Sequence, residues 1–244
     1  MVSERYPFNG WGTVAIQLAT EHLGRGIVKT LKEIGLTYNT DKAKHVITRD
    51  GMTYLDVYES YFQTRRYEKL NFLELGVLNG SSLRTWREYF PNASINGMDI
   101  DPGTLRFASP SENINVDIIS QTDTEKLEQY INGKSFDIII DDASHINRFT
   151  IHSFHILFKA LKEGGFYVIE DLGNSYIDLN THNLKQNWPG MRYNKEDDFE
   201  NRIEEIHEFT NKIVEEIDQM SSLNLSFGRY TYLHRYKWVM VIKK

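Results

Sequence analysis

Short apolar runs alternate with segments of helical periodicity through the middle of the chain. The runs are continuous rather than alternating, which is typical of strands buried on both faces of a parallel sheet. The predicted strands cover 71–75, 94–98, 114–119, 136–140 and 166–169. The predicted helices between them cover 81–90, 124–131 and 150–162, with Ser81 and Ser82 capping the first and Gly164 and Gly165 ending the last. This order predicts an α/β fold with a doubly wound, mostly parallel sheet.

The two ends of the chain depart from this alternation. Residues 1–62 predict an N-terminal helical extension, with helical spacing over 12–35 and 54–62, and residues 63–244 form the α/β domain. Residues 172–199 match no periodic pattern, and a stretch of this length predicts a lid or an acceptor loop. A helix over 201–220, with Ile203, Ile206, Ile213, Ile217 and Met220 facing inward, and an antiparallel hairpin over 230–242 complete the prediction.

Composition narrows the class of protein. The 244 residues favour one large domain over two. The chain has no cysteine, which excludes disulfides, thiolate metal sites and cysteine nucleophiles. The formal net charge of -6 argues against broad binding to nucleic acid or to an anionic membrane. No apolar run reaches a membrane-spanning length and no signal peptide pattern begins the chain, so we expect a cytoplasmic protein.

The first two predicted strands end in residues that suit a nucleoside. Ligands of open parallel sheets bind beyond the carboxyl ends of the strands. The first strand ends in a turn that runs from Glu74 through Gly76 and Gly80 to Ser81, and the second ends in Asp99, which can accept the hydroxyls of a ribose. Neither G-x-G-x-x-G nor a phosphate-binding loop is present. An adenosine ligand without phosphates, such as S-adenosylmethionine, fits this pattern, although the glycines alone also fit a purely structural turn.

A stronger signal lies at the ends of the fourth and fifth strands. Asp141 and Asp142 end one strand, Glu170 and Asp171 end the other, and parallel neighbours lie about 4.8 Å apart. Because clustered carboxylates repel one another, a hard divalent cation such as Mg²⁺, Mn²⁺ or Ca²⁺ would stabilise them. We expect Asp142, Glu170 and Asp171 to hold it and His145 to act beside it as a general base. The alternative is that these residues are helix caps and solvated strand ends.

Three motifs resemble a known family. They are E-L-G-V-L-N-G-S-S-L at 74–83, D-D-A-S-H at 141–145 and I-E-D-L at 169–172. Together they resemble the metal-dependent sugar O-methyltransferases of antibiotic pathways, of the mycinamicin-type macrolide and rhamnosyl classes. The preceding segment, with Thr40-Asp41-Lys42, His45 and Tyr54-x-x-x-Tyr58, is also similar, so the likeness covers roughly 37–172. One departure is Ala143, where the relatives usually have glycine.

The resemblance implies a class I methyltransferase fold of Rossmann-like type that uses S-adenosylmethionine. It implies Mg²⁺, with Mn²⁺ as a substitute, on Asp142, Glu170 and Asp171, catalytic roles for His145 and Asp142, and an assembly of two or four subunits. The residues that it places at or near the cofactor are Glu74, Gly76, Gly80, Ser81, Asp99, Gln121, Asp123 and Asp141. Lys42 and His45 are further candidates for the cofactor, although a solvated lysine and a loop histidine fit equally well. Tyr54 and Tyr58 have helical spacing and are predicted to lie in the core.

The expected function is methyl transfer from S-adenosylmethionine to a hydroxyl of a sugar, which could be a nucleotide sugar, a glycan or a glycosylated natural product. Two alternatives remain. One is an iron oxygenase that resembles cephalosporin hydroxylase, although two histidines for a facial triad are not evident. The other is a non-catalytic protein that binds an adenosine ligand. A nicotinamide dehydrogenase is disfavoured by the missing glycine fingerprint.

Overall fold

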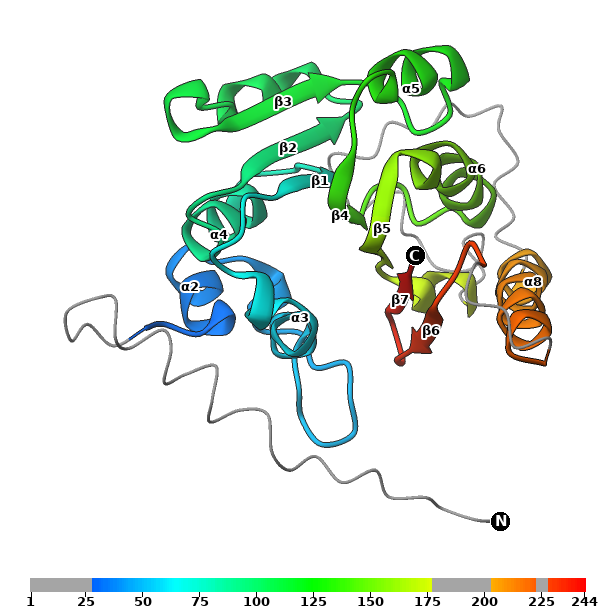
Figure 1. The fold of residues 1–244 in the computed structure, drawn as a ribbon. Helices are drawn as coiled ribbons and strands as arrows, with labels where there is room; N and C mark the ends of the chain where they lie inside the picture. The colour runs from blue at the N-terminus through cyan, green and yellow to red at the C-terminus, as the bar shows by residue number, and fades with distance from the viewer. Residues whose placement is uncertain (1–27, 177–202, 223–227) are drawn as a thin grey trace.

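A seven-stranded sheet forms the centre of the computed structural model, which describes residues 28–176, 203–222 and 228–244 (Figure 1). The strands lie in the order β3-β2-β1-β4-β5-β7-β6, and β1 to β5 are parallel. Strand β7 pairs antiparallel with both β5 and β6, so the predicted C-terminal hairpin is confirmed. The strands are β1 (Asn71–Leu75), β2 (Ser94–Asp99), β3 (Ile114–Ile118), β4 (Phe136–Asp141), β5 (Leu161–Ile169), β6 (Tyr232–Arg235) and β7 (Met240–Lys243).

Helices cover both faces of this sheet. In Figure 1, α2, α3 and α4 lie on one side and α5, α6 and α8 on the other, as a doubly wound fold requires. The helices are α2 (Leu31–Thr37), α3 (Tyr54–Phe62), α4 (Ser81–Tyr89), α5 (Thr124–Ile131), α6 (Asn147–Leu157) and α8 (Ile203–Ser222). The 3-10 turns are η1 (Asp41–Ala43), η2 (Gln63–Arg65), η3 (Pro102–Phe107), η4 (Pro110–Glu112), η5 (Phe158–Ala160) and η6 (Leu172–Tyr176). Among the described helices, none has the length and apolarity that crossing a membrane requires.

Each face has its own apolar core. Under α2, α3 and α4, the rings of Phe72 and Trp86 lie 5.0 Å apart, and Tyr58 packs against Trp86. Under α6 and α8, Phe154 contacts Phe209 with ring centroids 4.9 Å apart. Helices α2 and α3 therefore bury their apolar faces in the same core as α4 and the sheet. This packing fixes the described part of the N-terminal extension against the domain.

Most predicted elements are confirmed within one or two residues, but two predictions were wrong. The helix expected to run to 162 ends at Leu157, and β5 already begins at Leu161. Gly164 lies within β5 at φ 73, close to a register shift between β4 and β5, so it forms part of an irregular strand and does not end a helix. Gly80, not a serine, is the N-cap of α4, and the side chain of Asn79 accepts from the backbone of Ser81.

Several other predictions concern residues outside the described ranges. The helix predicted over 12–35 is described only from residue 28, where α2 begins three residues later at Leu31. Of the predicted lid over 172–199, only η6 (Leu172–Tyr176) is described. In α8, Ile206 and Ile213 are buried as expected, and Phe209 between them is also buried.

Candidate active site at the carboxyl edge of the sheet

The ends of β1, β4 and β5 meet, as the sequence pattern predicted. Leu75 lies opposite Asp141, and Asp141 lies opposite Ile169. The backbone amide of Asp142 donates to the carbonyl of Leu75 at 3.0 Å, and that of Glu170 donates to the carbonyl of Asp141 at 2.9 Å. The acidic residues that follow β4 and β5 therefore lie side by side at one edge of the sheet.

Lys42, from the turn η1, lies inside this acidic cluster. Its Nζ donates to Asp142 Oδ2, donates to Glu170 Oε2 at 2.7 Å and lies 3.9 Å from Glu74 Oε1. The side chain of Lys42 is only 5% exposed. We predicted a contact between Lys42 and the cofactor. The structure instead pairs it with two of the three residues predicted to bind metal.

Asp171 and His145 complete the cluster beside Asp142. The hydroxyl of Tyr54 donates to Asp171 Oδ1. The Nε2 of His145 lies 3.8 Å from Asp142 Oδ1 and 3.7 Å from Asp171 Oδ2. His145 and Asp171 both have left-handed backbone, at φ 56 and φ 55, which costs non-glycine residues energy and is frequent at functional sites. Their unusual backbone conformation is therefore maintained by the surrounding structure.

Burial and like charge decide the electrostatics of the cluster. Burial raises the pKa of Glu170 well above its usual value, the charge of Asp142 raises it further, and Lys42 opposes both effects. Burial also raises the pKa of Asp142, against the opposing effects of Lys42 and His145. Burial alone would lower the pKa of Lys42, but the adjacent carboxylates of Asp142, Glu170 and Glu74 raise it well above its usual value. A cation is thus strongly favoured among these carboxylates.

The turn after β1 packs directly against the end of β4. Gly76 has φ 89, and a Cβ there would lie 2.1 Å from the carbonyl oxygen of Asp142, so a side chain does not fit. Gly80, at φ 73, faces the ring of Phe107. Glu74 is fully buried and accepts from the hydroxyl of Ser82 at 2.6 Å. Burial raises the pKa of Glu74 to about 7, against the opposing effects of Lys42 and Ser82.

Asp99, the predicted ribose acceptor, forms hydrogen bonds with the same turn. Asp99 Oδ2 accepts from the backbone amides of Val77 at 2.8 Å and Leu78 at 3.2 Å, and its Oδ1 accepts from Asp101 at 2.8 Å. Leu78 and Ile100 are exposed beside it, each 62% accessible. The structure therefore places Asp99 next to the glycine turn, while its contact with a ribose stays a prediction.

Asp141 and Gln121 form a buried polar network behind the cluster. The amide of Gln121 donates to both oxygens of Asp141, at 2.9 and 2.7 Å, and its carbonyl oxygen accepts from Ser144 at 2.6 Å. The hydroxyl of Ser153 also donates to Asp141 at 2.9 Å. Burial raises the pKa of Asp141 to about 6, against these hydrogen bonds. In the structure both residues hold the loop that carries His145, and their contact with the cofactor stays a prediction.

The remaining candidates have local roles in the structure. Asp123 is the N-cap of α5 and accepts from the backbone of Lys126 at 3.1 Å. His45 is exposed, and its backbone amide bonds to the carbonyl of Asp41. Tyr54 was predicted only as a core residue. It is buried, but its hydroxyl reaches Asp171, and helical spacing carries no signal for that contact.

The donor set suits a hard divalent cation. Asp142, His145 and Asp171 each offer a ligand atom, and these atoms all lie within 4.8 Å of one another. The carboxylate oxygens of Asp142 and Asp171 are ligands that suit Mg²⁺ or Mn²⁺, and the imidazole nitrogen of His145 lies beside them. Glu170, the third predicted ligand, pairs with Lys42 on one oxygen, and its buried Oε1 has no hydrogen-bond partner. The residues present therefore fit a divalent cation.

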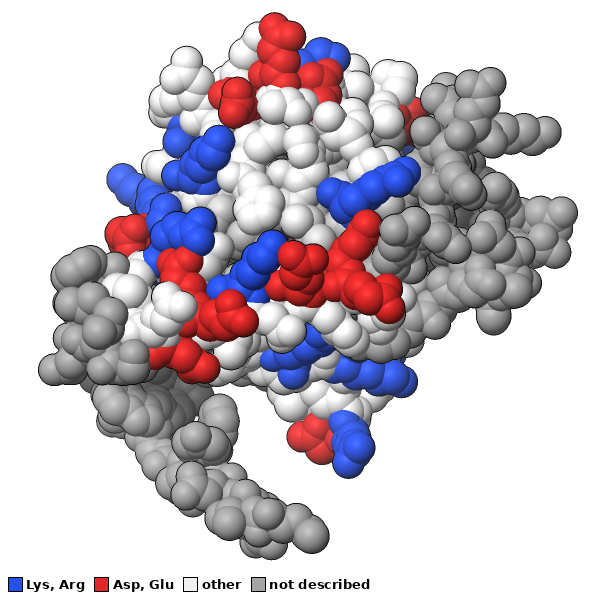
Figure 2. All heavy atoms as spheres, turned by 90° about the vertical axis from the view of Figure 1, so that its right-hand side faces the viewer, with Lys and Arg blue, Asp and Glu red and all other residues white. Residues whose placement is uncertain are grey.

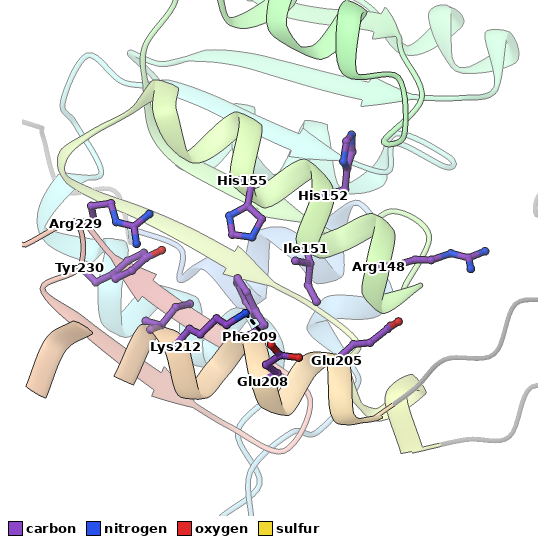
Figure 3. A pocket seen from close by; sticks show the side chains of 11 residues that line it. Arg148, Ile151, His152, His155, Glu205, Glu208, Phe209, Lys212, Arg229 and Tyr230 are labelled. Atoms are coloured by element: carbon purple, nitrogen blue, oxygen red, sulfur yellow. Dashed lines mark ion pairs between the residues drawn. The ribbon is translucent and has the colours of Figure 1, made fainter. Parts of the chain in front are cut away.

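A separate cavity lies between α6 and α8 (Figure 3). It has a volume of about 380 Å³, and its lining contains none of the candidate site residues. Two basic residues of its lining have local partners: Lys212 contacts Glu208 at 2.8 Å, and Arg229 contacts Glu216 at 2.5 Å. Figure 2, turned to the side of α8, likewise shows acidic and basic side chains next to one another. The candidate site residues therefore all lie outside this cavity.

The strand order and the position of this site define a class I S-adenosylmethionine-dependent methyltransferase fold of Rossmann-like type. The structure is similar to the MycE methyltransferase of the mycinamycin biosynthetic pathway in complex with Mg, SAH and mycinamycin VI. The TM-score is 0.66 at 26% identity, and the match covers 88% of this chain and 54% of that one.

Sequence comparison also finds O-methyltransferases. The chain is 35% identical over 145 residues to demethylmacrocin O-methyltransferase of Streptomyces fradiae, a match over 55% of this chain and 32% of that protein. It is 34% identical over 144 residues to mycinamicin VI 2''-O-methyltransferase of Micromonospora griseorubida, with the same coverage of 55% and 32%. The matches span about a third of the length of these curated relatives. No protein-family model matches the chain. The resemblance to sugar O-methyltransferases is confirmed.

Proposed function

We propose that the chain is an S-adenosylmethionine-dependent O-methyltransferase that requires a divalent cation and methylates a hydroxyl of a sugar. The observation that carries this proposal is the meeting of Asp142, His145 and Asp171 beside the glycine turn that follows β1. Relatives whose names include a glycosyl group, such as L-olivosyl-oleandolide 3-O-methyltransferase of Streptomyces antibioticus, support the substrate class. The acceptor could be a nucleotide sugar, a glycan or a glycosylated natural product.

The proposed cofactor site lies over the turn from Gly76 to Gly80, with Asp99 at its ribose end. Because Gly76 has no side chain, the backbone of the turn can lie against the loop after β4 and leave its outer side open to a ligand. The exposed side chains of Leu78 and Ile100 offer an apolar surface beside Asp99. These residues would hold the adenosine part and direct the sulfonium methyl towards the acidic cluster.

The reaction itself would be a direct displacement. His145 Nε2 faces the space between Asp142 and Asp171, where a sugar hydroxyl could enter. As the oxygen attacks the methyl carbon, the C–O bond forms, the C–S bond breaks with its electron pair passing to sulfur, and the hydroxyl proton moves to Nε2. General-base assistance of this kind contributes about 10²–10⁴-fold in rate. Mg²⁺ or Mn²⁺ would be held by Asp142 and Asp171 with Glu170 as the third ligand, so that His145 Nε2 serves as the base, and the cation would orient the sugar and lower the pKa of its hydroxyl.

Two observations bear on the alternatives. The group of possible metal ligands in the described residues has one histidine and two carboxylates, whereas iron oxygenases of the facial-triad type use two histidines and one carboxylate. The non-catalytic alternative requires a binding site alone, and it does not account for a histidine placed between two acidic residues.

A measurement of methyl transfer tests the proposed function. The purified chain is incubated with S-adenosylmethionine and a panel of sugars and glycosides, and methylated product is measured with Mg²⁺, with EDTA and after Mg²⁺ is restored. We expect activity that EDTA abolishes and Mg²⁺ restores. His145→Ala should lower kcat by at least about 100-fold, while His155→Ala, on α6 away from the cluster, should retain activity. Methylation that persists under full chelation would contradict the role of the metal.

We further propose that the protein works in the cytoplasm as a homo-oligomer of two or four subunits, in which residues 1–62 form an extension to a catalytic domain over 63–244. The support is the resemblance to a family with such assemblies. Light scattering on the purified full chain measures the subunit number, and a monomer at micromolar concentration would contradict the proposal.

A further inference from the structure

The two carboxylates beside His145 each have one oxygen bound to the protein and one oxygen facing the histidine. Asp142 Oδ2 accepts from Lys42 Nζ, and Asp171 Oδ1 accepts from the hydroxyl of Tyr54. The opposite oxygens, Asp142 Oδ1 and Asp171 Oδ2, are the atoms that lie 3.8 and 3.7 Å from His145 Nε2. The two donors thus bind the carboxylate oxygens that point away from His145 and leave the oxygens that face His145 available to a cation.

We propose that Lys42 and Tyr54 are positioning residues of the metal site: each holds one oxygen of a carboxylate, so that Asp142 Oδ1 and Asp171 Oδ2 are turned together towards the divalent cation. This inference rests on the proposed function, because it assumes that a cation binds between these residues. Lys42 and Tyr54 would then orient the metal ligands in addition to packing in the interior.

The physical reason is the freedom of an aspartate carboxylate. The last torsion of the side chain is broad and roughly two-fold, so an aspartate without a partner turns its oxygens easily. A donor that binds one oxygen fixes the direction of the other. Residues that hydrogen-bond to metal ligands in this way commonly change metal affinity by about 10–100-fold when they are removed.

Both donors are well placed to act in this way. Lys42 and Tyr54 are each 4% exposed, so water competes little for their hydrogen bonds. Lys42 also fixes Glu170 through Oε2, which leaves the buried Oε1 of Glu170 without a hydrogen-bond partner. That unpaired oxygen is a costly feature in a buried position, and a cation at the cluster would reduce its cost.

Neither donor comes from the sheet that carries the acidic residues. Lys42 belongs to η1 and Tyr54 begins α3, and both lie in the N-terminal segment that packs beside α4. The sequence separations are 100 residues from Lys42 to Asp142 and 117 from Tyr54 to Asp171. The N-terminal segment therefore contributes to the site directly, and its docking on the domain decides how the carboxylates are oriented.

Tyr54→Phe is the sharpest test, because it removes only a hydroxyl and leaves the charge of the site unchanged. Affinity for Mn²⁺ is measured by calorimetric titration of the full chain without cofactor or sugar. We expect Tyr54→Phe to bind Mn²⁺ about 10-fold more weakly than the natural sequence. Tyr61→Phe is the matched control: it lies on the same helix, and its hydroxyl bonds to Tyr236 at 2.6 Å, so its affinity should be unchanged.

Lys42→Arg is the second variant. It keeps the positive charge but replaces a compact ammonium by a planar guanidinium, which cannot bind Asp142 and Glu170 in the same geometry. It should also weaken Mn²⁺ binding, while Lys44→Arg, at an exposed position in the next turn, should not. Circular dichroism in EDTA verifies that each variant is folded.

The outcomes separate the two proposals. If the natural sequence binds no Mn²⁺, or if Asp142→Asn binds it equally well, the proposed metal site is wrong. If the natural sequence binds Mn²⁺ through Asp142 but Tyr54→Phe and Lys42→Arg bind it as tightly as their controls, the positioning role is overturned. Weaker binding in both variants, with both controls unchanged, supports it.

Discussion

Lys42→Met should destabilise the protein strongly in the absence of metal. The ammonium is almost fully buried, lies 2.7 Å from Glu170 Oε2, contacts Asp142 Oδ2 and lies 3.9 Å from Glu74 Oε1. Methionine has a similar shape and no charge, so the substitution leaves the carboxylates crowded without their counter-ion. Removing one partner of a buried ion pair costs about 3–5 kcal/mol. For a chain of this size that loss lowers the melting temperature by roughly 6–20 °C.

The assay is thermal unfolding followed by circular dichroism, in EDTA and in millimolar Mg²⁺. In EDTA the variant should melt well below the natural sequence. Mg²⁺ should raise the melting temperature of the natural sequence at least as much as that of the variant, because loss of the Lys42 donor also weakens binding of the cation. Lys44→Met is the matched control: Lys44 is exposed and bonds to Asn39 at 2.5 Å, so its melting temperature should change little. If Lys42→Met and the natural sequence have the same melting temperature in EDTA, Lys42 is not the counter-ion of the acidic cluster.

Three further predictions concern stability, each measured by urea unfolding. Gly76→Ala places a Cβ 2.1 Å from a backbone carbonyl oxygen. It should cost about 1–3 kcal/mol more than Gly133→Ala, because Gly133 also has a left-handed φ but faces open space. Equal losses would show that the loop adjusts. Phe209→Ala removes a buried ring of the α8 core and should cost about 3–5 kcal/mol; a loss below about 1 kcal/mol would contradict the packing of α8. Burial alone would raise the pKa of Asp137, but hydrogen bonds from Lys162, the Asn71 amide and Arg65 lower it. Its contribution is therefore present above its unfolded pKa and lost as pH falls through the lower folded value. Asp137→Asn should lose about 2 kcal/mol at pH 7, and the difference should shrink below about pH 4; a difference independent of pH would refute the assignment.

The sequence pattern predicted the elements of the sheet well, because a buried strand is specified locally. A short, mostly apolar run followed by glycine or an acidic residue is enough to recognise β1 and β4 and to locate their carboxyl ends. Since all parallel strands end at the same edge, the meeting of Asp142 with Asp171 followed from the pattern as well. The predicted end of α6 was wrong because Gly164 is compatible both with the end of a helix and with an irregularity in a strand. Only the pairing of β5 with β4 decides between these two structures.

The sequence alone therefore determined the α/β alternation, the edge of the sheet where the candidate site lies, and most of the acidic residues that gather there. Only the tertiary structure decided which oxygen of each carboxylate accepts a hydrogen bond from the protein, because Lys42 and Tyr54 reach Asp142 and Asp171 from two elements that lie 100 and 117 residues away along the chain. The reason is physical: apolar periodicity is a local property of the chain, whereas the partner of a buried polar atom depends on how whole elements pack against one another.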